Sequence, residues 1–199
     1  SQSASTLNLL RAFAVGGYAD LRHVQSWNMG FVKSGPQGER YRYIAEKIQE
    51  SLNFMEALGI NSNNTSQLRQ VKYYTSHEAL LLPYEESLTR IDSTSGEVYD
   101  TSAHFLWIGD RTRFLNSGHV EFCKGVQNPI GIKCGPTLDP DELISLLDVL
   151  NPSNEAGRIT LITRYGHKNI KTYLPKLIRK VKDEGRIVVW SCDPMHGNT

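Results

Sequence analysis

The feature that most constrains the fold is an alternation of short apolar segments with amphipathic helices in the second half of the chain. The apolar segments have the length of strands and cover residues 104–108, 129–133, 158–164 and 187–192. One intervening helix begins at Asp139, a capping residue, with Glu142 three residues later. The other ends at Gly185 and has apolar residues from Tyr173 to Val181 at helical spacing. Strands and helices that alternate in this way predict βαβ units and a parallel sheet.

Three polar side chains of functional type stand at or just after the ends of these segments: Lys133, Arg164 and His196. They follow one another at intervals of about 30 residues, the length of one βα unit. In a parallel α/β fold the carboxyl ends of the strands lie on one face, where binding groups gather. We therefore expect the three side chains to converge on one pocket. The first prediction for the fold is a (β/α)8 TIM barrel, and the second is an open doubly wound sheet.

The first third of the chain predicts helices. Apolar residues recur at helical spacing from Tyr41 to Leu58, and residues 5–13 form a shorter helical candidate. The predicted domain organisation is a helical segment over residues 1–69, followed by part of a barrel over residues 70–199.

Composition and charge argue against several classes of partner. The formal net charge is +1, and no basic patch with interleaved aromatic residues occurs, so nucleic acid is not an expected partner. No apolar run approaches the length of a membrane span, and the longest, residues 79–82, is expected in a core. Three cysteines are too few and too irregular for a disulfide framework, which favours a reducing compartment such as the cytoplasm.

Arg111 follows the first apolar segment and would add a third cation to the pocket of Lys133 and Arg164. An arginine offers a bidentate fork and a lysine a point charge, so such a cluster can stabilise a carboxylate or a phosphate. The alternative is that these are ordinary surface charges at strand ends. Their shared phase along the repeat favours the anion site.

His196 is a candidate metal ligand, because an imidazole at a strand end can coordinate a cation and Gly197 allows close backbone approach. The alternative is a structural histidine. Cys192 has a spacing from His196 that suits a zinc pair, but it falls within a predicted buried strand, where core packing is the better interpretation.

Two other motifs are not expected to form a catalytic or metal-binding site. His77 and Glu78 begin a metalloprotease-like pattern, but Leu81 replaces its second histidine. Glu85 and Glu86 do not face each other on a helix, so we expect a solvated pair. The sequence has no serine-nucleophile elbow, glycine-rich phosphate loop or dinucleotide fingerprint.

Taken together and in order, seven blocks of the chain resemble class II (plant and microbial type) 3-deoxy-D-arabino-heptulosonate 7-phosphate (DAHP) synthases. The blocks are residues 2–13, 75–85, 99–104, 107–113, 128–133, 157–164 and 190–199. The resemblance covers nearly the whole chain.

The resemblance implies a metal-dependent, aldol-type transferase. The enzyme would condense phosphoenolpyruvate with erythrose 4-phosphate and water to DAHP and phosphate, the first step of the shikimate pathway to the aromatic amino acids. The implied phosphoenolpyruvate-binding residues are Asp110, Arg111, Lys133 and Arg164, with Lys133 also catalytic. The implied metal ligand is His196, and the metal would be manganese, cobalt or magnesium. Asp110 departs from the family pattern, which has the longer Glu at this position.

The resemblance also implies that the chain is an internal fragment covering about strands 2–6 of the barrel, inactive by itself. The family's other metal ligands, a Cys before this region and a Glu and an Asp after it, would lie outside it. Residues 38–58 would form an inserted helix pair that serves an inhibitor site in some members. The full-length enzyme would be a homo-oligomer, in the cytoplasm or, in a plant, in the plastid.

Two other functions stay open from the sequence. One is a complete anion-binding or regulatory relative without catalysis, and the other is a different metal-dependent, aldolase-like barrel. Further coding sequence with the missing Glu and Asp would favour the synthase over the first. A Cys ligand before Ser1 would favour it over the second.

Overall fold

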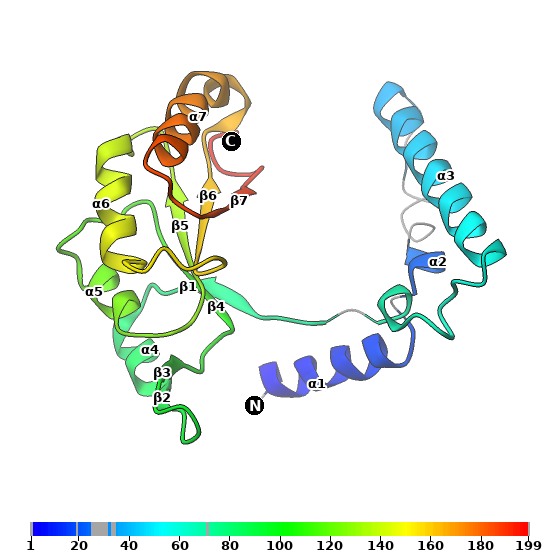
Figure 1. The fold of residues 1–199 in the computed structure, drawn as a ribbon, viewed down its shortest axis with the longest axis horizontal. Helices are drawn as coiled ribbons and strands as arrows, with labels where there is room; N and C mark the ends of the chain where they lie inside the picture. The colour runs from blue at the N-terminus through cyan, green and yellow to red at the C-terminus, as the bar shows by residue number, and fades with distance from the viewer. Residues whose placement is uncertain (1, 19, 25–31, 33–34, 71, 199) are drawn as a thin grey trace. The chain divides into compact units, whose positions relative to one another are not determined.

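A computed structural model describes residues 2–18, 20–24, 32, 35–70 and 72–198. These residues divide into two compact units, one up to Tyr73 and one from Tyr74 onward (Figure 1).

The N-terminal unit is helical in the part that the structure describes. Its helices are α1 (Gln2–Val15), α2 (Leu21–Val24), α3 (Pro36–Ala57) and a short 3-10 helix (Ser66–Leu68). Pro36 stands in the first turn of α3, where its missing N–H costs nothing, and Gly59 follows the helix with φ of 81°. One continuous helix thus covers the range where the resemblance implied a pair, because no helix breaker interrupts residues 39–57. No residue of α3 is buried.

The C-terminal unit is built around a parallel sheet, which confirms the predicted α/β class. Among the described residues the sheet has five strands in the order β1-β4-β5-β6-β7. These are β1 (Ser76–Glu78), β4 (Phe105–Ile108), β5 (Ile130–Cys134), β6 (Ile159–Thr163) and β7 (Val189–Cys192). Every neighbouring pair is parallel. Two further strands, β2 (Thr89–Ile91) and β3 (Val98–Asp100), form a separate antiparallel pair.

Helices follow the strands in sequence: α4 (Leu82–Leu88), α5 (Gly118–Lys124), α6 (Pro140–Leu150) and α7 (Gly166–Asp183). Each contacts the next along the chain. Asp139 caps α6, since its carboxylate accepts hydrogen bonds from the backbone N–H groups of Asp141 and Glu142 at 2.8 and 3.4 Å. The predicted cap is therefore confirmed, and so is the end of α7 just before Gly185.

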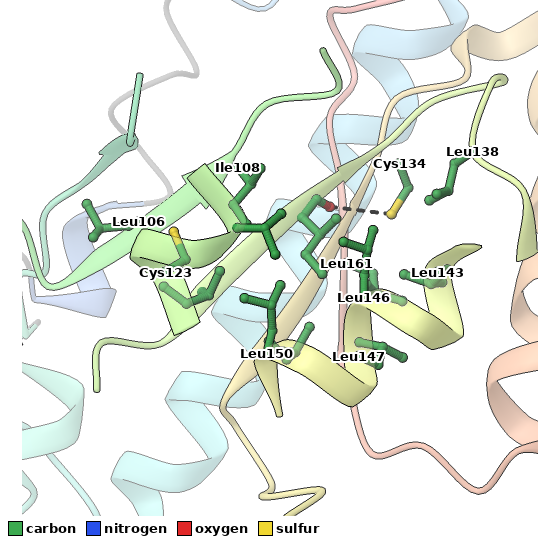
Figure 2. Close-up of a cluster of buried hydrophobic side chains, with 14 of the residues drawn as sticks. Leu106, Ile108, Cys123, Cys134, Leu138, Leu143, Leu146, Leu147, Leu150 and Leu161 are labelled. Atoms are coloured by element: carbon green, nitrogen blue, oxygen red, sulfur yellow. Dashed lines mark hydrogen bonds between the residues drawn. The ribbon is translucent and has the colours of Figure 1, made fainter. Parts of the chain in front are cut away.

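The core lies between one face of the sheet and these helices, as Figure 2 shows. Burial alternates along β4 and β6, and side chains such as Leu106, Ile132 and Leu161 are fully buried beneath the helices. Their neighbours in the strands, including Trp107 and Lys133, are only half-buried on the opposite face. The polar groups of the strands therefore collect away from the helix layer.

Three expectations about burial were wrong. Ala79 is buried, but Leu80 and Leu81 are 54% and 66% exposed, because β1 ends at Glu78 and they lie beyond the sheet. Strand β7 is exposed along its whole length, since β6 is its only neighbour among the described residues. Cys192 is consequently an exposed thiol.

No helix in the described part of the chain combines the length and the apolar character needed to cross a membrane.

Candidate active site

All five residues singled out from the sequence line one cavity of about 340 Å³ at the carboxyl ends of the strands. They are Asp110, Arg111, Lys133, Arg164 and His196, and Glu78, Trp107 and Gly109 complete the lining. The structure therefore brings together the polar groups that sequence spacing placed at one phase of the repeat. The cavity carries both signs of charge.

Lys133 projects from β5 on the face of the sheet opposite the helices. Its Nζ lies 2.6 Å from Asp193 Oδ2 and 5.3 Å from the ring centre of Trp107. The side chain is 14% exposed, so the ammonium is shielded but reaches the cavity. A carboxylate and an aromatic face hold the lysine in place.

Arg164 is oriented by Asp110. Its Nη1 donates to Asp110 Oδ2 at 2.7 Å, while Asp110 Oδ1 accepts from Arg113 Nε and from the backbone N–H of Gly135, both at 3.2 Å. Arg113 is buried, and its Nη1 donates a hydrogen bond to Glu142 Oε1 at 2.7 Å. The carboxylate of Asp110 thus joins Arg164 to the buried Arg113, which in turn contacts Glu142 of α6.

Arg111 differs from the other two cations. Its side chain is exposed, and its guanidinium makes no hydrogen bond or ion pair with a described residue. All five N–H donors are therefore available to a ligand in the cavity. An anion that enters can gain a contact with Arg111 without breaking an existing one.

Two glycines allow the carboxylates to approach the backbone at the cavity. A Cβ at Gly109 would lie 2.2 Å from Glu78 Oε1, and a Cβ at Gly135 would lie 2.5 Å from Asp110 Oδ2. Both distances are below any contact that two such atoms tolerate. The positions of Glu78 and Asp110 therefore depend on glycine opposite them.

Asp193, which sequence reasoning passed over, contacts two of the predicted site residues. Its Oδ2 accepts from Lys133 Nζ and lies 2.6 Å from His196 Nδ1. Burial by itself would raise the pKa of Asp193, but hydrogen bonds from Lys133 and from the backbone and ring of His196 outweigh it and hold the pKa well below its usual range. Asp193 is thus a carboxylate at neutral pH.

His196 is 59% exposed, and its Nε2 is the ring nitrogen that Asp193 does not contact. An imidazole with a carboxylate on one nitrogen and the other nitrogen free has the donor chemistry of a metal-binding histidine. The described residues contain no group of three or more His, Cys, Asp or Glu side chains that could hold an ion. His196 therefore fits as one ligand, and these residues supply no complete set.

Glu78 and Asp193 could have been found by the same strand-end argument. Glu78 is the last residue of β1, and Asp193 directly follows β7. The hydrophobic pattern does not indicate β1, because this strand has three residues and no apolar run. Asp193 stands in the same motif as His196, and the motif alone does not show which side chains the carboxylate contacts.

The remaining carboxylates behave differently from the prediction. Glu86 is exposed, but Glu85 is buried and contacts His77 Nε2 at 2.8 Å and Ser102 Oγ at 2.6 Å. The expected solvated pair is therefore wrong for Glu85, because α4 turns this residue inward. His77 and Glu78 lie in a strand, so they do not form the helical metalloprotease motif.

The comparisons with known proteins agree on one family. The sequence profile of the Class-II DAHP synthetase family matches residues 1–199. The chain is 51% identical over 197 residues to a phospho-2-dehydro-3-deoxyheptonate aldolase of Streptomyces coelicolor. It is 52% identical over 172 residues to a probable chloroplastic enzyme of that name from Catharanthus roseus. It is 44% identical over 204 residues to the enzyme named AroG of Mycolicibacterium smegmatis.

These alignments cover 99%, 86% and 100% of this chain. The chain spans only 43%, 35% and 43% of the length of the three relatives. By the match over its whole length, the chain belongs to the class-II DAHP synthetase family.

Proposed function

We propose that this chain forms the phosphoenolpyruvate-binding part of a DAHP synthase, which joins phosphoenolpyruvate to erythrose 4-phosphate at the start of the shikimate pathway. One observation carries the proposal: Arg111, Lys133 and Arg164 line a single cavity in a chain of this family. Three relatives bear the name of this enzyme.

The proposed fold of the complete enzyme is a (β/α)8 barrel, of which this chain supplies about strands 2–6. The strand order β1-β4-β5-β6-β7 follows the chain without reversal, whereas a doubly wound sheet reverses at a switch point. Successive helices also pack against each other. In a barrel the half-buried face with Trp107 and Lys133 would be the interior, and the cavity would be its carboxyl-terminal mouth.

The three cations have distinct roles in the proposed site. Arg111 is the free fork that captures the phosphate or carboxylate of phosphoenolpyruvate. Arg164 is held by Asp110 and gives a second donor at a fixed place. Lys133, the proposed catalytic residue, places a positive charge where negative charge develops.

The reaction forms a carbon–carbon bond between C3 of phosphoenolpyruvate and the aldehyde carbon of erythrose 4-phosphate. Water then adds to C2, and the C2–O bond to phosphate breaks. Arg111, Lys133 and Arg164 would hold the phosphate through these steps and stabilise it as it leaves. The shielded position of Lys133 strengthens its electrostatic contribution compared with a fully solvated charge.

His196 would be one ligand of a divalent metal, which is manganese, cobalt or magnesium in this proposal. When bound, the metal supplies Lewis-acid polarisation of the aldehyde. The other ligands would come from parts of the enzyme beyond the described residues. We further propose a homo-oligomer, in the cytoplasm or in the plastid if the source is a plant.

A chimera tests the proposal directly. This chain would replace the matching 197-residue segment of the Streptomyces coelicolor relative, and release of phosphate that depends on both substrates would be measured with manganese. We expect activity of the same order as that of the parent enzyme. A chimera that folds and oligomerises like the parent but releases no phosphate would contradict the proposal.

A further inference from the structure

The carboxylate of Asp193 is surrounded by hydrogen-bond donors. Its Oδ1 accepts from the backbone N–H groups of Met195 and His196 at 3.1 and 3.2 Å. Its Oδ2 lies 2.6 Å from both Lys133 Nζ and His196 Nδ1. The side chain is only 8% exposed, so water does not replace these contacts. Asp193 therefore joins the loop after β7 to β5.

The contact with His196 determines which ring nitrogen carries the proton. An ionised carboxylate only accepts hydrogen bonds, so Nδ1 must be the protonated nitrogen of a neutral ring at this distance. The lone pair is then on Nε2, the nitrogen that Asp193 does not contact. A free histidine side chain prefers the opposite tautomer, with the proton on Nε2.

We propose that Asp193 is a positioning residue that fixes His196 in the Nδ1–H tautomer and holds Lys133 at the cavity with the same oxygen atom. Asp193 acts through these two side chains and is not itself a catalytic residue. The two backbone contacts of Oδ1 lie within the loop after β7. The two contacts of Oδ2 reach the cavity side chains, and this is where the positioning role resides.

The role in catalysis rests on the proposed function, but the geometry does not. If His196 coordinates a cation through Nε2, the Nδ1–H tautomer presents that lone pair without a prior change of protonation site. If the proposed function fails, Asp193 still fixes the ring and the lysine. The two ideas can therefore be separated by experiment.

Nitrogen NMR of the histidine rings in the 199-residue chain tests the tautomer, at a pH where the rings are neutral. His196 should show a protonated Nδ1 and an unprotonated Nε2, assigned by comparison with His196→Gln. His119 and His104 serve as internal controls with the opposite tautomer. His119 Nε2 must donate to the Leu80 carbonyl at 3.0 Å, and His104 Nδ1 accepts from the Thr75 N–H at 3.1 Å. A predominantly Nε2-protonated His196 in the wild-type chain would overturn the proposal.

Asp193→Asn preserves the size of the side chain but replaces one acceptor oxygen of the carboxylate with an NH₂ group that donates hydrogen bonds. The amide oxygen should stay with the two backbone donors, which turns the NH₂ group toward Lys133 and His196. His196 should then change to the Nε2–H form, while His119 and His104 stay as they were. Asp183→Asn, at the end of α7, is the matched control and should leave His196 unchanged. Retention of the Nδ1–H form in Asp193→Asn, with the rest of the spectrum unchanged, would refute the role of the carboxylate.

The chimera gives a second readout that is not activity. Mn²⁺ affinity, measured by electron paramagnetic resonance without substrates, should fall about 10–100-fold in Asp193→Asn, the usual loss when the partner of a ligand histidine is removed. Unchanged affinity alongside a changed tautomer would refute the link to the metal. A chimera that binds no Mn²⁺ at all would count against the proposed function, and the ring spectra would still decide the role of Asp193.

Discussion

At the scale of single residues, Arg164 is one of the two cations of the cavity that a carboxylate holds in place. It is 26% exposed and held by Asp110 at 2.7 Å. Arg164→Ala in the chimera should remove one charge-assisted contact with phosphoenolpyruvate and leave the carboxylate of Asp110 with Arg113 and the backbone N–H of Gly135. The expected cost is roughly 2–5 kcal/mol in kcat/KM for phosphoenolpyruvate, as for a shielded charge pair that loses one partner. Steady-state kinetics with phosphoenolpyruvate as the varied substrate measure it.

A matched control is Arg179→Ala, an arginine of α7 beside an apolar groove and outside the cavity. It should leave the kinetics unchanged. If Arg164→Ala behaves like this control, Arg164 is merely a surface charge and the anion site is smaller than proposed.

The cavity residues could be predicted in part because strand ends converge in any parallel sheet. Arg111, Lys133 and Arg164 stand at one phase of the repeat, and that phase is visible in the sequence. Their partners are not visible in the same way. The contact of Lys133 with Asp193 joins residues 60 positions apart, and it depends on a side-chain geometry that spacing does not encode.

At the scale of elements, apolar strand segments and the Asp139 cap were sufficient to predict four strands and the start of α6. Burial was harder to predict, because it depends on neighbours. Leu80 and Leu81 are apolar but lie beyond the end of β1. Glu85 is charged, yet α4 turns it toward the core. Hydrophobic pattern alone cannot show that a buried acid has found donors.

Those donors belong to a polar cluster that joins β1, α4 and the end of β3. Its members are His77, Glu85, Asp100 and Ser102. Glu85 contacts His77 and Ser102, and Asp100 Oδ1 accepts from the Ser102 N–H at 2.8 Å. Asp100 Oδ2 is buried and receives no hydrogen bond from the described residues.

Burial first, and then the neighbouring Glu85, raise the pKa of Asp100. Burial by itself would raise the pKa of Glu85 too, but the hydrogen bond from Ser102, the neighbouring Asp100 and the contact with His77 lower it. Burial and the neighbouring Glu85 thus favour the protonated form of Asp100.

The cluster predicts opposite pH dependences for two variants. Asp100 has a raised pKa in the native state, so its contribution to stability is full below about 3.9 and is lost as pH rises through the native pKa. Asp100→Asn is uncharged at every pH and therefore resembles the protonated form of Asp100. Its free energy of unfolding should therefore rise relative to wild type between pH 4.5 and 8, by about 1.4 kcal/mol for each unit of the native shift.

Glu85→Gln should show the reverse. The lowered pKa of Glu85 contributes stability that is present above about 4.3 and is lost as pH falls through the native pKa, so the variant should lose more stability at pH 8 than at pH 3. Urea unfolding of the chain at pH 3, 4.5 and 8 measures the two differences. Parallel slopes for the two variants would contradict opposite shifts in the pKa of the two carboxyl groups.

At the scale of the whole molecule, the two units differ in how much they bury. The C-terminal unit contains one contiguous core of aliphatic side chains from the sheet and its helices. In the N-terminal unit, α3 buries no residue, and Tyr43, Ile44, Ile48 and Phe54 are between 45% and 66% exposed. Helices of this length gain most of their stability in proteins from tertiary packing. In this chain α3 has little tertiary packing, because none of its residues is buried.

Hydrogen exchange should therefore separate the two units. Amides of β5 and β6, which lie inside the sheet, should exchange only when the C-terminal unit unfolds, whereas amides of α3 should exchange through local opening. Mass spectrometry of the exchanging chain, at two protein concentrations, measures both.

Fast exchange of α3 at both concentrations is the expected result for a chain that is monomeric in this range. Protection of α3 that increases with concentration would indicate that copies of the chain cover its apolar side chains, in line with the proposed homo-oligomer. Protection equal to that of β5 at both concentrations would contradict the exposed helix altogether, because nothing in an unpacked helix could slow its opening to that extent.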